Sequence, residues 1–177
     1  FPQLASSIDT ISKLNEQISR HTGSSVPAMD MEHVAGYKGA KFIGDIYESV
    51  RKQQTIIIEY QSFKARQPEA LTVYPYLLKE YRNRWFLIGE KASNRVPQVN
   101  IFALDRIQSV ALDKEHPFKK SVAFDPEHFF DDTIGVTKGI HDKARRVVIK
   151  IDRQQAPYVE SKPFHKSQKV EQRFRDG

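Results

Sequence analysis

Aromatic and basic side chains recur together between residues 60 and 106, and this combination could bind a ligand that carries flat rings and negative charge. Rings stack on unpaired bases while arginines neutralise phosphates, so such a surface suits single-stranded nucleic acid. Stacking contributes about 1–3 kcal/mol per base. The residues expected to contact such a ligand are Tyr60, Tyr74, Tyr76, Arg82, Arg84, Phe86, Asn100, Phe102 and Arg106.

The same rings could instead belong to a core. Side chains alternate between the two faces of a strand, so Trp85 and Phe86 point to opposite faces, as do Ile101 and Phe102. One set of rings must therefore lie away from the interior of a sheet. That set either packs on a helix predicted over residues 42–50 or stays open to a partner.

Patterns typical of catalysis or metal binding are missing from the sequence. There is no cysteine, and the six histidines are scattered without metal-ligand spacing. Phosphate-binding glycine loops and nucleophile motifs are also missing. His165, Ser167 and Gln168 are close in sequence but have no acidic neighbour. Asp105 directly follows a predicted strand and is expected to cap a turn, whereas Arg106 stays open as a ligand contact. We therefore expect no enzyme, no cofactor and no metal site.

The elements that would position these side chains follow from spacing and composition. An amphipathic helix is expected from Leu4 to Ile18, either packed on its own domain or serving as a linker or dimerisation helix. After the helix at residues 42–50, five strand-like segments lie at residues 55–60, 71–78, 84–89, 99–104 and 107–112. Strands that follow one another without helices between them predict a small five-stranded antiparallel barrel. Pro75 cannot donate a ladder hydrogen bond and marks an edge or a bulge.

The fold class predicted for the whole chain is mainly β within an α+β protein. Residues 1–36 are expected to form a helical linker or dimerisation segment, and residues 37–113 a helix followed by the barrel. Residues 114–177 are expected to hold a linker and a partial second α+β domain. Within it we predict a helix start at Asp125, strands at residues 145–151 and 169–174, and a short helix at residues 156–159.

Charge and hydropathy limit the classes of protein. The net charge of +6 is uneven: residues 1–36 carry −2, while residues 37–113 and 114–177 carry +4 each. This excess permits binding to a polyanion, although solvated lysines alone would give the same composition. No apolar run approaches the about twenty residues that cross a bilayer, and there is no signal peptide. Together with the lack of cysteine, this favours the cytoplasm. Because the chain begins at Phe1 without methionine, we interpret it as a fragment of a longer protein.

Several short motifs occur in a characteristic order. The triplet Trp85-Phe86-Leu87 is preceded by a strand ending in Tyr60 and by Pro75-Tyr76-Leu77. It is followed by Phe102-Ala103-Leu104-Asp105-Arg106-Ile107. In these motifs the chain resembles the WYL domain family, which is named for a Trp-Tyr-Leu triplet and carries an aromatic-x-Leu-Asp-Arg-Ile signature. Pro163-Phe164-His165-Lys166-Ser167-Gln168 is similar to a segment of the C-terminal extension of the family, called WCX. The resemblance covers about residues 36–177.

The resemblance implies a bacterial transcriptional regulator. Its WYL domain would be an Sm-like barrel that senses nucleic acid or a nucleotide-like ligand, and a winged helix-turn-helix would bind DNA in a homodimer. The chain departs from the family pattern at Leu71 and Asn100, where the family usually has arginines. Phosphate recognition through that pair is therefore not expected here. Neighbouring cations that could supply the charge instead are Arg82, Arg84, Lys91 and Arg95.

A second interpretation keeps the barrel but removes the switch. The segment could be a stand-alone Sm-like module that binds single-stranded nucleic acid, or a dimerisation scaffold. Fusion to a helix-turn-helix would favour the sensor, because a sensor must act on a second, DNA-binding site.

Overall fold

The computed structural model describes residues 38–122, 124–139 and 142–174, and the chain divides into two compact units between Ser121 and Val122. The helix predicted from Leu4 to Ile18 lies outside the described residues. The first unit contains the 3-10 turn η1 (Ala40–Phe42), helix α2 (Ile43–Lys52), and strands β1 (Ile56–Tyr60), β2 (Glu69–Tyr81), β3 (Arg84–Lys91), β4 (Val99–Ala103) and β5 (Ile107–Leu112). A second 3-10 turn, η2 (Leu104–Arg106), joins β4 to β5.

The five predicted strands and the predicted helix before them are confirmed. The strands form one antiparallel sheet in the order β4-β3-β2-β1-β5. Its core face alternates as expected, since Ile56 and Ile58 on β1 are fully buried while Ile57 is 37% exposed. Helix α2 packs Ile46 into the same core cluster, and Phe42 of η1 joins it. The first unit is thus a helix laid on one face of a sheet.

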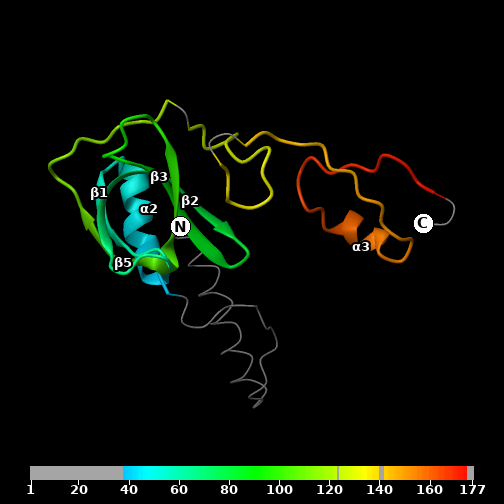
Figure 1. Ribbon diagram of the computed structural model, residues 1–177, viewed down its shortest axis with the longest axis horizontal. Coiled ribbons are helices and arrows are strands. Elements are labelled where there is room, and N and C mark those ends of the chain that lie inside the picture. The colour runs from blue at the N-terminus through cyan, green and yellow to red at the C-terminus, as the bar shows by residue number, and fades with distance from the viewer. Residues whose placement is uncertain (1–37, 123, 140–141, 175–177) are drawn as a thin grey trace, which may run out of the picture. The chain divides into compact units, whose positions relative to one another are not determined.

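The sheet is strongly curled. Its two edge strands, β4 and β5, are joined only by the three residues of η2, which can span about 10 Å. Tyr60 on β1 also contacts Phe102 on β4 with ring centroids 5.3 Å apart, although β2 and β3 lie between these strands in the sheet. Figure 1 shows the strands curving around α2.

The expected closed barrel is not what the strand pairing shows. The sheet is described with β4 and β5 as its edges, and no pairing between them occurs among the described residues. The two edges approach at η2, but a helical turn of backbone stands there in place of a ladder. The fold is therefore an antiparallel sheet, curled and open at this seam, with one helix before it.

Pro75 lies at a bulge and also beyond the ladder to β1. Strand β2 pairs with β1 only from Glu69 to Val73, so at Pro75 it is paired with β3 alone. Its register with β3 shifts between Pro75 and Leu77, where Pro75 is opposite Gly89 and Leu77 is opposite Ile88. The missing N–H of proline is tolerated because the ladder is already interrupted there.

The strands predicted in the second unit are wrong. Its described residues contain helix α3 (Ala156–Ser161), as expected, but no strand. The segment at residues 145–151 runs with Val147 75% exposed, and it meets residues 169–174 only through side chains such as the Arg146–Glu171 ion pair. β-branched residues favour strands only where a partner completes the ladder and buries one face. The helix start predicted at Asp125 is a series of turns instead.

No helix in the described part of the chain has the length and apolar character needed to cross a membrane.

Candidate functional site

Three segments far apart in the sequence meet at η2. The Arg106 carbonyl accepts a hydrogen bond from the Gln61 backbone N–H at 3.0 Å, which fixes η2 to the end of β1. Asp105 forms an ion pair with Arg84 at the start of β3, with Oδ2 and Nη2 2.5 Å apart. We call this region the η2 surface. Its side chains are Gln61, Phe63, Arg84, Asp105, Arg106 and Gln108.

Phe63 and Arg106 form an exposed stack on the η2 surface. The guanidinium carbon of Arg106 lies 4.2 Å from the ring centroid of Phe63, within cation–π range. Phe63 is 78% exposed, so one ring face contacts Arg106 while most of the ring is open to solvent. It is the only aromatic among the exposed large hydrophobic side chains of residues 38–121. A turn closed by the Ala65 N–H donating to the Ser62 carbonyl at 2.9 Å presents it.

Unused polar groups surround this stack. Arg106 Nε and Asp105 Oδ1 are buried without a hydrogen-bond partner in the described part of the chain. The sequence predicted that Asp105 caps a turn through backbone amides. In the structure, its Oδ2 pairs with Arg84 and its Oδ1 has no partner among the described residues. Beside them, Gln108 donates from Nε2 to Gln61 Oε1 at 2.7 Å, and this amide pair is exposed. The η2 surface thus combines a ring, two guanidinium groups and amide donors and acceptors.

Four of the rings predicted to contact a ligand are buried or half-buried within the first unit. Phe102 is 3% exposed in the core cluster, and Tyr60 packs against that cluster from its edge. Trp85 also packs against that cluster. Tyr74 is 5% exposed on the opposite face of β2. Phe86 is half-buried on β3, on the opposite face from Leu87 of the core.

Tyr76 and Tyr74 both contact Phe118, which lies in the segment after β5. The Phe118 ring meets both tyrosines edge-on, at centroid distances of 5.9 Å to Tyr76 and 6.3 Å to Tyr74. The Tyr76 hydroxyl donates to Glu90 Oε2 at 3.4 Å. Burial, and then the nearby Glu90 carboxylate, raise the pKa of Tyr76, so its hydroxyl stays neutral and is engaged within the fold. These two rings are less accessible than Phe63.

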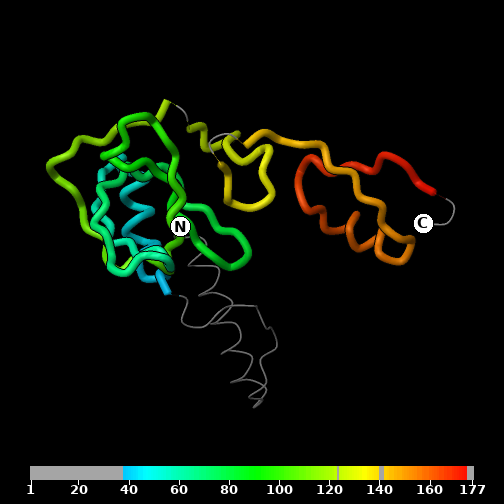
Figure 2. Tube along the Cα trace, viewed as in Figure 1, coloured from blue at the N-terminus to red at the C-terminus, as the bar shows by residue number. Residues whose placement is uncertain are grey.

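Arg82 lies in the turn between β2 and β3, and Asn100 lies in β4 opposite Gly89. Arg82 is exposed at the tip of the β2–β3 hairpin, traced in Figure 2, and has a left-handed φ of 50°. Asn100 Oδ1 accepts from the Asn94 side chain at 3.1 Å and so braces the β3–β4 loop. Leu71, the other departure from the family pattern, is 6% exposed in the core. Of the nine predicted contacts, the structure brings Arg84 and Arg106 together on the η2 surface.

Phe63 was not among the residues predicted from the sequence. A signal was present, because Phe63 stands in a loop between Gln61 and the cations Lys64 and Arg66. Surfaces that bind single strands combine aromatic and basic side chains.

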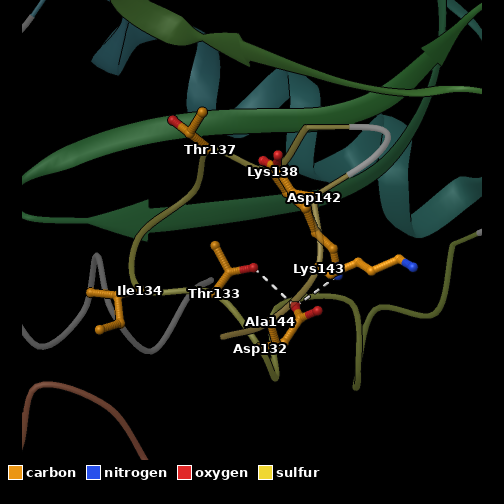
Figure 3. A pocket seen from close by; sticks show the side chains of 8 residues that line it. All are labelled: Asp132, Thr133, Ile134, Thr137, Lys138, Asp142, Lys143 and Ala144. Carbon is orange, nitrogen blue, oxygen red and sulfur yellow. Dashed lines mark hydrogen bonds and ion pairs between the residues drawn. The ribbon is translucent and has the colours of Figure 1, made fainter. Parts of the chain in front are cut away.

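The second unit holds a cavity of about 210 Å³, shown in Figure 3. It is lined by Asp132, Thr133, Ile134, Thr137, Lys138, Asp142, Lys143 and Ala144. Its groups already satisfy one another: Lys138 Nζ donates to Asp132 Oδ1 at 2.7 Å, and Asp142 accepts from the Gly139 N–H at 2.7 Å. Within the described ranges, no group of three or more potential ligands could hold a metal ion.

The His165 motif is a structural turn. His165 Nδ1 lies 2.8 Å from Ser167 Oγ and also accepts from the Ser167 N–H at 3.2 Å. Gln168 donates to the Val159 carbonyl at 2.9 Å and accepts from the Phe164 N–H at 3.0 Å. These bonds fasten the turn to α3.

Comparison with known families decides what kind of domain carries the η2 surface. The model of the WYL domain family matches residues 41–112, from within η1 to the end of β5. This chain contains a WYL domain. The WYL domain comprises α2 and the whole sheet, and therefore all six residues of the η2 surface. The match ends at Leu112, so the WCX-like extension predicted at residues 114–177 stays a prediction.

Among solved structures, the chain is similar to the proteasome accessory factor B/C (PafBC) of Arthrobacter aurescens. The TM-score is 0.42 and the sequence identity is 21%. The similarity covers 56% of this chain and 14% of the PafBC chain. No curated protein matches the chain by sequence.

Proposed function

We propose that this chain is the ligand-sensing part of a bacterial DNA-binding transcriptional regulator, and that its WYL domain recognises nucleic acid or a nucleotide-like anion. The WYL domain supports the class of protein, because its family resemblance implies regulators of this kind. The ligand would be coupled to a dimeric helix-turn-helix of the same regulator. Such coupling requires the ligand to bind two arrangements of the dimer with different affinities.

The observation that carries the proposal is the η2 surface within the WYL domain. Phe63 offers an open ring, and Arg106 and Arg84 place two guanidinium groups beside it. Arg84 is already paired with Asp105, so Arg106 is the cation best placed to meet a phosphate. Rings combined with cations give affinity for single strands without requiring a particular base sequence.

The remaining parts of the proposal concern architecture. We propose that the curled sheet is the small Sm-like barrel that the resemblance implies, with its edge strands joined through η2 and not through a β4–β5 ladder. We further propose that residues 114–177 include the start of a WCX-like extension, and that the regulator is a cytoplasmic homodimer. These points depend on the family resemblance.

A direct test is the binding of fluorescently labelled oligo(dT) to the 177-residue chain at two salt concentrations. We expect binding that weakens as salt rises, because each neutralised phosphate of a single strand contributes a slope of about −0.7 in log affinity against log salt. Arg106→Gln should lower the affinity severalfold and reduce the slope by about 0.7. Fluorescence anisotropy measures both quantities.

The matched control is Arg51→Gln. Arg51 pairs with Glu48 at 2.8 Å near the end of α2, which precedes the start of β1, whereas the η2 surface adjoins the end of β1. This variant removes the same charge and should leave the affinity nearly unchanged. Equal losses in both variants would indicate a general charge effect, and no binding at low salt would contradict the proposal. Binding without any change in operator affinity of the regulator would favour the stand-alone module.

A further inference from the structure

We infer that Phe63, together with Arg106 and the Gln61–Gln108 pair, forms a subsite for one unpaired nucleobase. The inference rests on the proposed function and adds to it by assigning the base and the phosphate to different side chains. None of Gln61, Phe63 and Gln108 was among the contacts predicted from the sequence.

The arrangement of the ring defines what it can receive. Arg106 lies 4.2 Å from the Phe63 centroid, and the ring is 78% exposed, so a flat group can stack on its open face. The backbone that carries the two side chains is fixed by the Ser62–Ala65 turn and by the bond from the Gln61 N–H to the Arg106 carbonyl. A fixed backbone lowers the conformational entropy that is lost when a base stacks on the ring.

The polar groups beside the ring suit the rest of a nucleotide. Gln61 Oε1 accepts from Gln108 Nε2 at 2.7 Å, and Gln61 Nε2 donates to the Ala65 and Arg66 carbonyls at 3.3 and 3.4 Å. The remaining amide capacity for the edge of a base is therefore the second N–H and the carbonyl oxygen of Gln108. Arg106 Nε has no partner in the described part of the chain, although a buried guanidinium N–H ordinarily has one. Because Nε itself is buried, a phosphate would meet the terminal nitrogens of the Arg106 guanidinium, with charge-assisted hydrogen bonds.

An abasic oligonucleotide separates the two contributions, because it keeps the phosphates and lacks the bases. We expect the wild-type chain to bind oligo(dT) about tenfold more tightly than an abasic strand of equal length. Phe63→Leu keeps an apolar side chain but removes the flat ring, and it should abolish most of this preference while leaving the salt slope unchanged. Phe63→Trp should keep or increase the preference, because the larger ring stacks as well.

The control variant is Val96→Ala, which alters another exposed apolar side chain, in the β3–β4 loop and 72% exposed. It should retain the wild-type preference. Competition with dTMP distinguishes the two sources of the base: displacement at micromolar dTMP assigns the subsite to a free nucleotide, and no displacement assigns it to a strand.

The outcomes for the subsite and for the proposed function are distinguishable. If the wild-type chain binds neither strand, the proposed function fails and the subsite fails with it. If the chain binds oligo(dT) but Phe63→Leu keeps the full preference over the abasic strand, the subsite is wrong while the proposed function stands.

Discussion

Gly39→Ala is expected to destabilise the first unit by about 3 kcal/mol or more. Gly39 has a φ of 104°, a conformation that alanine rarely adopts. A Cβ at this position would lie 2.3 Å from the Leu104 carbonyl oxygen and 2.9 Å from the Asp105 N. These are backbone atoms of η2, so the clash can be relieved only by moving η1 away from η2. Urea unfolding followed by circular dichroism measures the change in the free energy of unfolding.

Gly44→Ala is the matched control. Gly44 lies in α2, and a Cβ there would meet no atom within 4 Å. Alanine is a better helix former than glycine, so this variant should be neutral or more stable by up to about 1 kcal/mol. Equal effects of the two substitutions would contradict the close approach of η1 to η2. Gly39 packs against the backbone of η2, which carries Asp105 and Arg106. The substitution therefore also tests the position of the η2 surface.

The second large effect is expected for Ile58→Ala. Ile58 is fully buried in the core cluster between β1 and α2, and truncation removes apolar contacts and leaves a cavity. The expected loss is about 2–5 kcal/mol in the free energy of unfolding. The neighbouring substitution Ile57→Ala should cost about 1 kcal/mol or less, because Ile57 is 37% exposed on the other face of β1. Both values come from urea unfolding of the 177-residue chain.

The contrast between Ile57 and Ile58 tests the register of the sheet. A shift of one residue in β1 would exchange the two faces and reverse the order of the two losses. A larger loss for Ile57→Ala than for Ile58→Ala would therefore be incompatible with the pairing of Ile58 opposite Leu71 and Val110.

The sheet was predictable from the sequence because its signals are local. Runs such as residues 55–60 are rich in β-branched residues, and Pro75 marked the bulge in β2. The strands predicted at residues 145–151 and 169–174 carry similar signals and did not form. A strand depends on pairing partners that propensity does not include, and no partner strand stands beside either segment in the described part of the chain.

The candidate site was less predictable, because its geometry is not local. Phe63 and Arg106 are far apart in the sequence and meet because η2 joins the two edges of a curled sheet. Ring composition alone could not separate Phe102, which is buried in the core, from Phe63, which is exposed in a loop without periodicity. Arg84 and Arg106 were found because their charges flank recognisable strand motifs.

The central claim is that the η2 surface is where the WYL domain receives its ligand. Nuclear magnetic resonance of the isotope-labelled 177-residue chain, titrated with oligo(dT), tests it most directly. We expect the largest shifts at the Phe63 ring and at the Arg106 Nε–H signal, with Arg51 on α2 unaffected. Saturating shifts confined to other residues, with the Phe63 and Arg106 signals unmoved, would contradict the claim.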